Sequence, residues 1–301
     1  HQNNYDLWAT VSAERQTFGA QELTVRDVGG RVSLVTQTEG LHLLTVDEVG
    51  GKLGDGSAIV DGTVGITTFV LADAEQNDVD LAIIADEARP RYGNFFLGTV
   101  EGRIDIANDA PGEQVDVAGT MTLSHAEMNV PLFSPDAETG ALYGMSSEFP
   151  AVNLGVRLAI GPDVRVRTTG LTAPLEPLDP AIRIEGTPQE PRVQGQIVLQ
   201  EGEARVSGGV LDIEQGRVQF MVRRKLGSIG DAPHELELTG PISITATSTI
   251  EETVIQGRRL EDVIIRMQVS GQLPNHLFVE VSSSPPLADE QIYALLGTAP
   301  F

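Results

Sequence analysis

Cysteine is missing altogether from this chain of 301 residues. Without it the protein has no disulfide framework, no thiolate chemistry and no cysteine-ligated zinc. Aromatic residues are also few, at 5% of the chain with a single Trp. Sites that cleave carbohydrates usually offer aromatic platforms to the sugar, so the composition supplies little material for a glycosidase. A catalytic pair of carboxylates distant from each other in sequence stays open.

Basic residues are outnumbered by acidic ones. The chain has 20 Lys and Arg against 43 Asp and Glu, which gives a net charge of −23. Such a surface repels phosphate backbones and anionic headgroups, so we expect no nucleic-acid partner. One basic cluster stands out, Arg223, Arg224 and Lys225, and we interpret it as a solvated turn.

Long apolar runs are absent as well. No stretch reaches the length of a membrane-spanning helix. The chain begins with His1 rather than Met, and no signal-like segment follows it. We therefore expect a fragment or processed product of a longer protein, which leaves room for a membrane anchor outside this sequence.

The usual catalytic signatures are missing too. The chain contains no nucleophile elbow, phosphate-binding loop, dinucleotide fingerprint or zinc-protease motif. Its histidines do not fall at metal-ligand spacing, and we interpret them as strand-face or loop residues: His1, His42, His125, His234 and His276. The sequence predicts no enzyme, no catalytic residue, no cofactor and no metal site.

Short apolar alternation separated by turn residues is what the chain does contain. Gly accounts for 32 residues and Pro for 17, while hydrophobic residues make up 41%. Turn signals recur at a spacing of roughly ten residues, as at Gly29-Gly30, Gly50-Gly51 and Asp61-Gly62. This spacing is typical of meandering antiparallel strands, and we predict an all-β fold. For residues 81–85 the pattern leaves two alternatives, a buried strand or the core of a short helix.

Breaks in the alternation suggest a division of the chain. Residues 124–150 contain Pro131, Pro135, Gly140, Gly144 and Pro150, and we predict a loop or hinge there. Residues 1–123 then form a β-rich repeating body. Residues 151–301 form a C-terminal β region.

A short helix is expected near the C-terminus, at about residues 285–297. Pro286 suits the first turn of a helix, as do Asp289 and Glu290. Ile292, Leu295 and Leu296 follow at the spacing of one helical face.

The strands of residues 151–301 each present one apolar face, and the open question is what covers it. A second sheet, a closed barrel and a non-protein ligand are the alternatives. The residues alone favour an ordinary sandwich core, because sandwiches are common. A transmembrane barrel would require aromatic girdles that the composition lacks. The alternating apolar positions are Leu154, Val156, Leu158, Ile182, Ile184, Ile197, Leu199, Leu211, Ile213, Val218, Phe220, Leu236, Leu238, Ile242, Ile244, Ile265, Met267, Val279 and Val281.

Several motifs of this region occur in an order that resembles a known family. They are residues 181–197 (AIRIEGTPQEPRVQGQI), 200–204 (QEGEA), 211–220 (LDIEQGRVQF), 269–271 (VSG) and 283–296, which begins SSPPL. In this order and spacing they resemble the C-terminal region of the TamB family, the translocation and assembly module subunit, from about residue 151 to the end. The turns at residues 51–56 and 61–64 are similar to those of that family's repeating body.

The resemblance implies a fold and a set of partners. The fold is an elongated, mostly antiparallel β-sheet folded into a taco-like groove with an apolar interior, plus the short C-terminal helix. Family members are envelope proteins anchored in the inner membrane, and they bridge the periplasm to the outer membrane. The implied partners are phospholipid acyl chains and an Omp85-type outer-membrane barrel, TamA-like or BamA-like.

Among the alternatives for the apolar strand face, the resemblance favours an open groove that holds a non-protein ligand. The implied function is to conduct phospholipid between the two membranes and so support outer-membrane biogenesis. The alternating positions then line the groove, and Leu287, Ile292, Leu295 and Leu296 form either a plug at its end or a docking helix for the barrel. Two further functions stay open. One is a chaperone or scaffold that assists outer-membrane barrel assembly by β-augmentation. The other is a passive envelope spacer.

Overall fold

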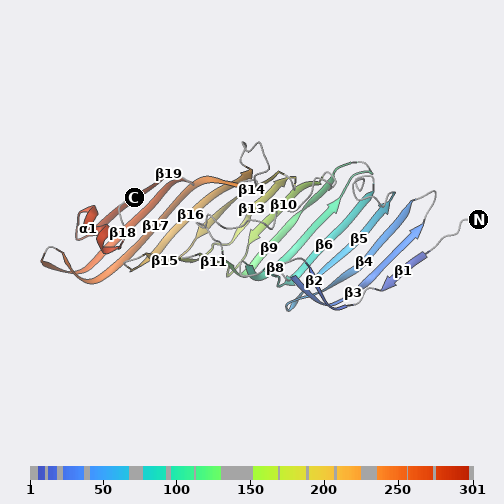
Figure 1. Ribbon diagram of the computed structural model, residues 1–301, viewed down its shortest axis with the longest axis horizontal. Helices are drawn as coiled ribbons and strands as arrows, with labels where there is room; N and C mark the ends of the chain where they lie inside the picture. Colours follow the sequence, from blue (N-terminus) through green and yellow to red (C-terminus); the bar gives the residue numbers. More distant parts are fainter. Residues whose placement is uncertain are drawn as a thin grey trace, which may run out of the picture.

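The protein is an elongated, all-β molecule in the computed structural model (Figure 1). The structure describes residues 6–10, 13–18, 23–36, 41–67, 77–92, 96–111, 113–129, 152–168, 170–187, 190–206, 209–224, 236–255, 257–273 and 276–297. All statements below concern these residues.

The N-terminal strands are β1 (Asp6–Thr10), β2 (Ala13–Phe18), β3 (Leu23–Thr36), β4 (His42–Leu53), β5 (Gly56–Ile66), β6 (Asp78–Ala88), β7 (Arg91–Tyr92), β8 (Phe96–Ala107) and β9 (Val115–Asn129). The C-terminal strands are β10 (Val152–Ile160), β11 (Arg165–Thr168), β12 (Leu171–Pro174), β13 (Leu178–Gly186), β14 (Pro191–Leu199), β15 (Gly202–Val206), β16 (Gly209–Arg224), β17 (Leu236–Ile255), β18 (Arg258–Leu273) and β19 (His276–Ser284). Residues 81–85, which the sequence left between strand and helix, lie in β6.

These strands form one continuous sheet. From β3 to β6, and from β16 to β19, each strand pairs antiparallel with the next, while β6 pairs with β8 and β8 with β9. Between β9 and β16 the sheet has two short rows, β10–β13–β14 and β11–β12–β15, and both rows end on β16. The predicted all-β, mostly antiparallel fold is therefore confirmed.

Strand β9 is the exception to antiparallel pairing, because it lies parallel to both β10 and β11. A parallel pair needs a connection of a dozen or more residues, and residues 130–151 separate β9 from β10. The loop expected over residues 124–150 was placed too early at its start, since residues 124–129 are part of β9. The remainder of that loop lies outside the described residues, and the division into two regions stays a prediction.

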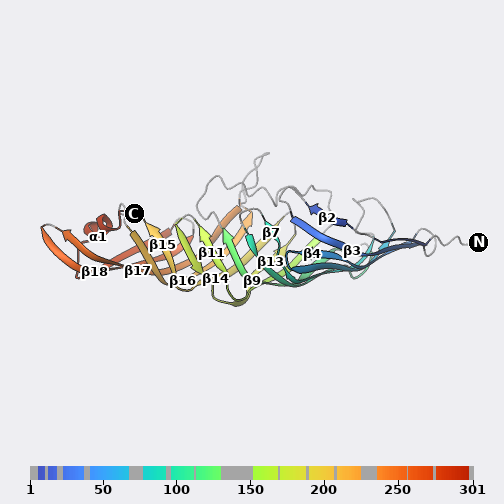
Figure 2. The ribbon, with the colours of Figure 1, turned by 90° about the horizontal axis from the view of Figure 1, so that it is seen from below.

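The sheet is curled about its long axis, so that the long strands bend as they cross it (Figure 2). Glycines with positive φ stand inside several of these strands, at +142° for both Gly102 and Gly240. A Cβ on Gly240 would lie 2.1 Å from the carbonyl oxygen of Gln219 on the neighbouring strand. Only glycine allows the strands to approach this closely with such a backbone conformation.

The main core lies within the C-terminal half of the sheet. Leu211, Val263 and Ile265 have no exposed surface there, and Val164 from the turn after β10 joins them. A smaller cluster of Leu53, Ala85 and Ala88 lies in the N-terminal half.

Helix α1 (Asp289–Leu295) is shorter than the helix expected over residues 285–297. The hydroxyl of Ser283 makes two hydrogen bonds with the segment that precedes the helix. It accepts one from the Leu287 N–H at 2.9 Å and donates one to the Pro285 carbonyl oxygen at 2.8 Å. The Gln291 side chain then accepts the Ala288 N–H at 3.1 Å. These bonds hold residues 285–288 outside the helix and start its first turn at Asp289.

Candidate functional site

One face of the sheet is apolar from β3 to β19. Residues that are paired across strands share a face, and so do residues two apart along a strand. Three paired rows trace this face: Leu34–Leu44–Val64–Val79 on β3 to β6; Leu81–Ile106–Val117–Leu154 on β6 to β10; and Val156–Ile184–Val193–Val222–Leu238 on β10 to β17. Val269 and Val279 extend it over β18 and β19. None of these residues is charged.

The predicted lining residues all come from this face, but the structure divides them by burial. Leu199, Leu211, Ile213 and Ile265 are buried, with at most 5% of their surface exposed, and belong to the core. Leu158, Ile182, Ile197, Ile244, Met267 and Val281 are half-buried and pack against that core. The rest are half-buried without belonging to it, namely Leu154, Val156, Ile184, Val218, Phe220, Leu238, Ile242 and Val279. Leu236 begins β17, and its side chain lies outside the described part.

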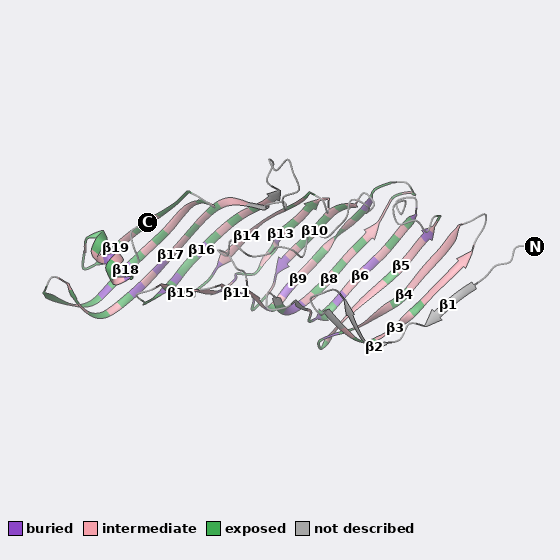
Figure 3. Ribbon diagram, viewed as in Figure 1, coloured by how far each residue is buried: buried purple, intermediate pink, exposed green. Residues whose placement is uncertain are grey.

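We refer to the last set of eight residues as the open apolar face. In a sandwich, a second sheet packs directly on such residues and removes them from solvent. Here they keep an intermediate exposure, while their neighbours along each strand, such as Arg157, Arg183 and Ser243, are exposed on the opposite face (Figure 3). Among the described residues, the main core, which includes Ile292 and Leu296 of the C-terminal helix, therefore buries its own members, while the open apolar face stays half-exposed.

Sequence reasoning missed the N-terminal part of this face, because it assigned lining positions only beyond residue 151. The missed residues include Ile104 and Ile106 on β8 and Val117 and Met121 on β9. Their alternation was visible in the sequence. What the sequence does not show is that β9 pairs with β10, because 22 residues separate the two strands in the chain. This pairing joins the N-terminal positions to the face that continues beyond residue 151.

Helix α1 lies at the C-terminal end of the sheet, against β19 (Figure 1). Ile292 and Leu296 are 1% and 3% exposed and belong to the main core. Leu287 and Leu295 are half-buried and pack against it. The four predicted helix residues are therefore brought together on the sheet, while their role as plug or docking piece stays a prediction.

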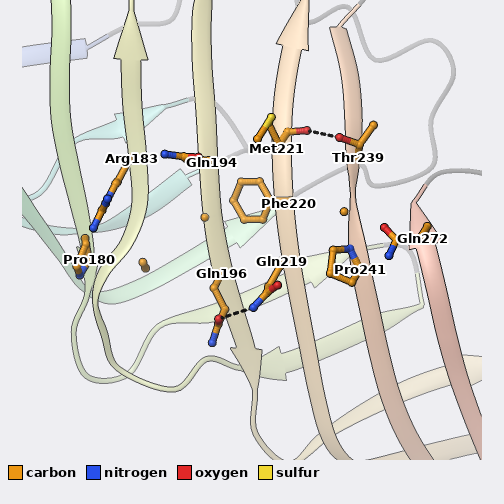
Figure 4. Close-up of a pocket in the computed structure, with 13 residues that line it drawn as sticks. Pro180, Arg183, Gln194, Gln196, Gln219, Phe220, Met221, Thr239, Pro241 and Gln272 are labelled. Carbon is orange, nitrogen blue, oxygen red and sulfur yellow. Dashed lines mark hydrogen bonds between the residues drawn. The ribbon is translucent and has the colours of Figure 1, made fainter.

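The opposite face of the sheet is polar and holds a hollow of about 590 Å³ over β13, β14, β16, β17 and β18 (Figure 4). Phe220 is also among its lining residues, although the alternation of β16 places its side chain on the apolar face, where Gly195 is its register partner on β14 and Gly240 lies beside it on β17. The side-chain NH₂ of Gln219 donates a hydrogen bond at 3.0 Å to the side-chain amide oxygen of Gln196, its register partner on the neighbouring strand. This hollow was not anticipated from the sequence.

Charges on the polar face and the turns form exposed ion pairs, such as Arg89 with Asp55 at 3.0 Å and Arg259 with Glu252 at 2.9 Å. Pairs this exposed contribute little to stability. The described residues contain no group of three or more His, Asp or Glu side chains that could hold a metal ion. Within the same residues, no helix has the length and apolarity needed to cross a membrane.

These observations define a class of protein, a long curled sheet with one uncharged apolar face that the described residues leave partly uncovered. A family model described as the TamB C-terminal domain matches residues 47–299. The chain belongs to the TamB family and is a component of the cell envelope. A search of curated proteins found no match, and neither did a search of solved structures.

Proposed function

We propose that the open apolar face carries phospholipid acyl chains between the inner and outer membranes and so supports outer-membrane biogenesis. One observation carries the proposal. Apolar residues are aligned without a charge from β3 to β19, and those of the open apolar face remain half-exposed.

The hydrophobic effect supplies the driving force. Each methylene removed from water contributes about 0.8 kcal/mol, so an acyl chain of roughly 16 carbons gains on the order of 10 kcal/mol. The headgroup stays in water, because the face offers it no charged or hydrogen-bonding side chain in the traced rows. Recognition then concerns the acyl chain alone.

The shape of the face suits movement better than storage. Leu, Ile and Val form most of it, and Phe220 is the one aromatic residue of the open apolar face. Because similar side chains repeat from strand to strand, an acyl chain meets nearly the same contacts at each step. No covalent step is required.

Helix α1 would close the face at one end. Ile292 and Leu296 belong to the same core cluster as Ile265, so an acyl chain cannot pass under the helix without displacing it. Delivery to the outer membrane then requires a partner at this end, and an Omp85-type barrel, TamA-like or BamA-like, is the partner that we propose. The inner-membrane anchor would lie outside this chain.

Site-specific photocrosslinking tests the proposal. A photoreactive residue is placed at Ile184 on the open apolar face, and its matched control is placed at Glu185, the next residue on the opposite face. After irradiation in cells, lipid attached to the purified protein is identified by mass spectrometry. Lipid at residue 184 and not at residue 185 supports the proposal, and equal lipid at both or at neither contradicts it. A passive spacer would carry no lipid at either position.

A second candidate function is a scaffold that holds strands of outer-membrane barrels by β-augmentation. Strand β19 pairs with β18, and it exposes Phe278 and Leu277, at 67% and 41%. A strand-binding role predicts that Phe278→Ser weakens binding of a barrel-derived peptide, measured by fluorescence anisotropy, and leaves crosslinking at residue 184 unchanged. If the peptide bound the Phe278→Ser variant with unchanged affinity, β19 would not be the strand that it docks on.

A further inference from the structure

Two arginines face each other on the polar face of the sheet without a counter-charge. Arg157 on β10 and Arg183 on β13 are register partners, so their side chains leave the same face side by side. Both are exposed, and neither forms an ion pair within the described residues. Like charges directly opposite each other in a sheet destabilise it. Among the 43 acidic residues of the chain, none in the described part forms an ion pair with either arginine.

Of this pair, Arg183 lines the hollow of Figure 4, and Arg157 is its register partner outside the lining. Arg183 and Pro180 lie together on one side of the hollow and Gln272 lies on the other side. Its lining includes four glutamines, Gln194, Gln196, Gln219 and Gln272, and Arg183 is the one charged residue among the lining residues. The nearest acid along β13 on this face is Glu185, and its register partner is Arg192.

We propose that this hollow binds an anionic group, a phosphate or a carboxylate, carried by a ligand whose remaining part is polar and uncharged. The Arg183 guanidinium provides a planar fork of donors that matches either anion, and Arg157 adds a second positive charge beside it. Glutamine amides supply both donors and acceptors for the rest of the ligand.

The hydrogen bond between the side chains of Gln219 and Gln196 orients both amides before any ligand binds. Gln219 uses one amide hydrogen on the Gln196 oxygen, at 3.0 Å. The NH₂ of Gln196 is therefore left as a donor at the floor of the hollow, and the oxygen of Gln219 as an acceptor. The lining residues that the structure describes include no carboxylate that would compete with an anion for these donors.

The arginine and glutamine side chains of this site lie on the face of the sheet opposite the open apolar face, and Phe220 is the one lining residue that the two sites share. The test is a titration of the 301-residue chain with inorganic phosphate and with acetate at constant ionic strength. The side-chain amide signals of glutamine are followed by NMR. We expect saturable shifts, and Arg183→Gln should weaken the affinity about tenfold, the effect of losing a charge-assisted hydrogen bond.

Arg217→Gln is the matched control, since Arg217 is exposed on the same face of β16 but outside the hollow. Vesicles containing phosphatidylglycerol form a second arm, which separates a lipid headgroup from a free anion as the source. Thermal unfolding of each variant verifies folding, and Arg157→Gln should be no less stable than the wild type. The proposal is overturned if shifts do not saturate in either arm, or if the substitutions at Arg183 and Arg217 weaken binding equally.

Discussion

Replacing Ile242 by Asp should abolish acyl-chain binding while leaving the sheet folded. Ile242 lies on the open apolar face of β17, between Val218 on β16 and Gly271 on β18 in register. The side chain is half-buried, so its removal costs about 1 kcal/mol of hydrophobic stabilisation. The poor strand propensity of Asp adds up to about 1 kcal/mol.

The effect on the lipid should be larger than the effect on the fold. An acyl chain passing over the new carboxylate would desolvate it, which costs several kcal/mol per ion. Partial exposure of the site places the penalty at the lower end, at about 3 kcal/mol, which corresponds to more than a hundredfold loss of binding. The readout is crosslinking of lipid to a photoreactive residue at Ile184, with thermal unfolding recorded in parallel.

Ser243→Asp is the control, because Ser243 is the next residue of the same strand and is exposed on the opposite face. Its register partner is Arg217, which tolerates a carboxylate. The control should crosslink like the wild type. If Ile242→Asp kept its crosslinking while remaining folded, the open apolar face would not be the path of the acyl chain.

Three further outcomes are expected from the packing. Gly240→Val should destabilise the protein by several kcal/mol in chemical denaturation, because its Cβ would clash at 2.1 Å with the Gln219 carbonyl and its φ is +142°; Gly209→Ala, with no atom within 4 Å, should change stability far less. Ile292→Ala should cost about 2–5 kcal/mol, since the side chain is 1% exposed, whereas the exposed Glu290→Ala should cost under about 0.5 kcal/mol; equal effects would contradict the packing of α1 on the core. Glu252→Gln should change stability by at most about 1 kcal/mol, because its 2.9 Å pair with Arg259 is exposed, and a larger loss in thermal unfolding would refute that assessment.

The sequence predicted the strands well where alternation is regular. Leu154, Val156 and Leu158 alternate with Asn153, Gly155 and Arg157, and the structure places them as the two faces of β10. It predicted the helix less well, because residues 285–288 satisfy helix-start preferences but their hydrogen bonds go to Ser283 and Gln291. It predicted a loop from residue 124, although β9 continues to Asn129.

The lining residues illustrate the limit of pattern reasoning most clearly. Leu211 and Ile244 follow the same alternation, yet Leu211 is fully buried in the core and Ile244 is half-buried against it. A charge at Leu211 would therefore disrupt folding itself and could not test lipid binding. Alternation reports which face a residue occupies and carries no information about what lies above that face.

By itself the sequence determined the all-β class, the uncharged character of one strand face and the presence of a C-terminal helix. These follow from local preferences at positions one to four residues apart. Tertiary structure alone decided that β9 pairs parallel with β10, that part of the apolar face stays uncovered, and that Arg157 meets Arg183 beside a polar hollow. Those features depend on register between strands that are far apart in the chain, and period-2 alternation is compatible with many registers.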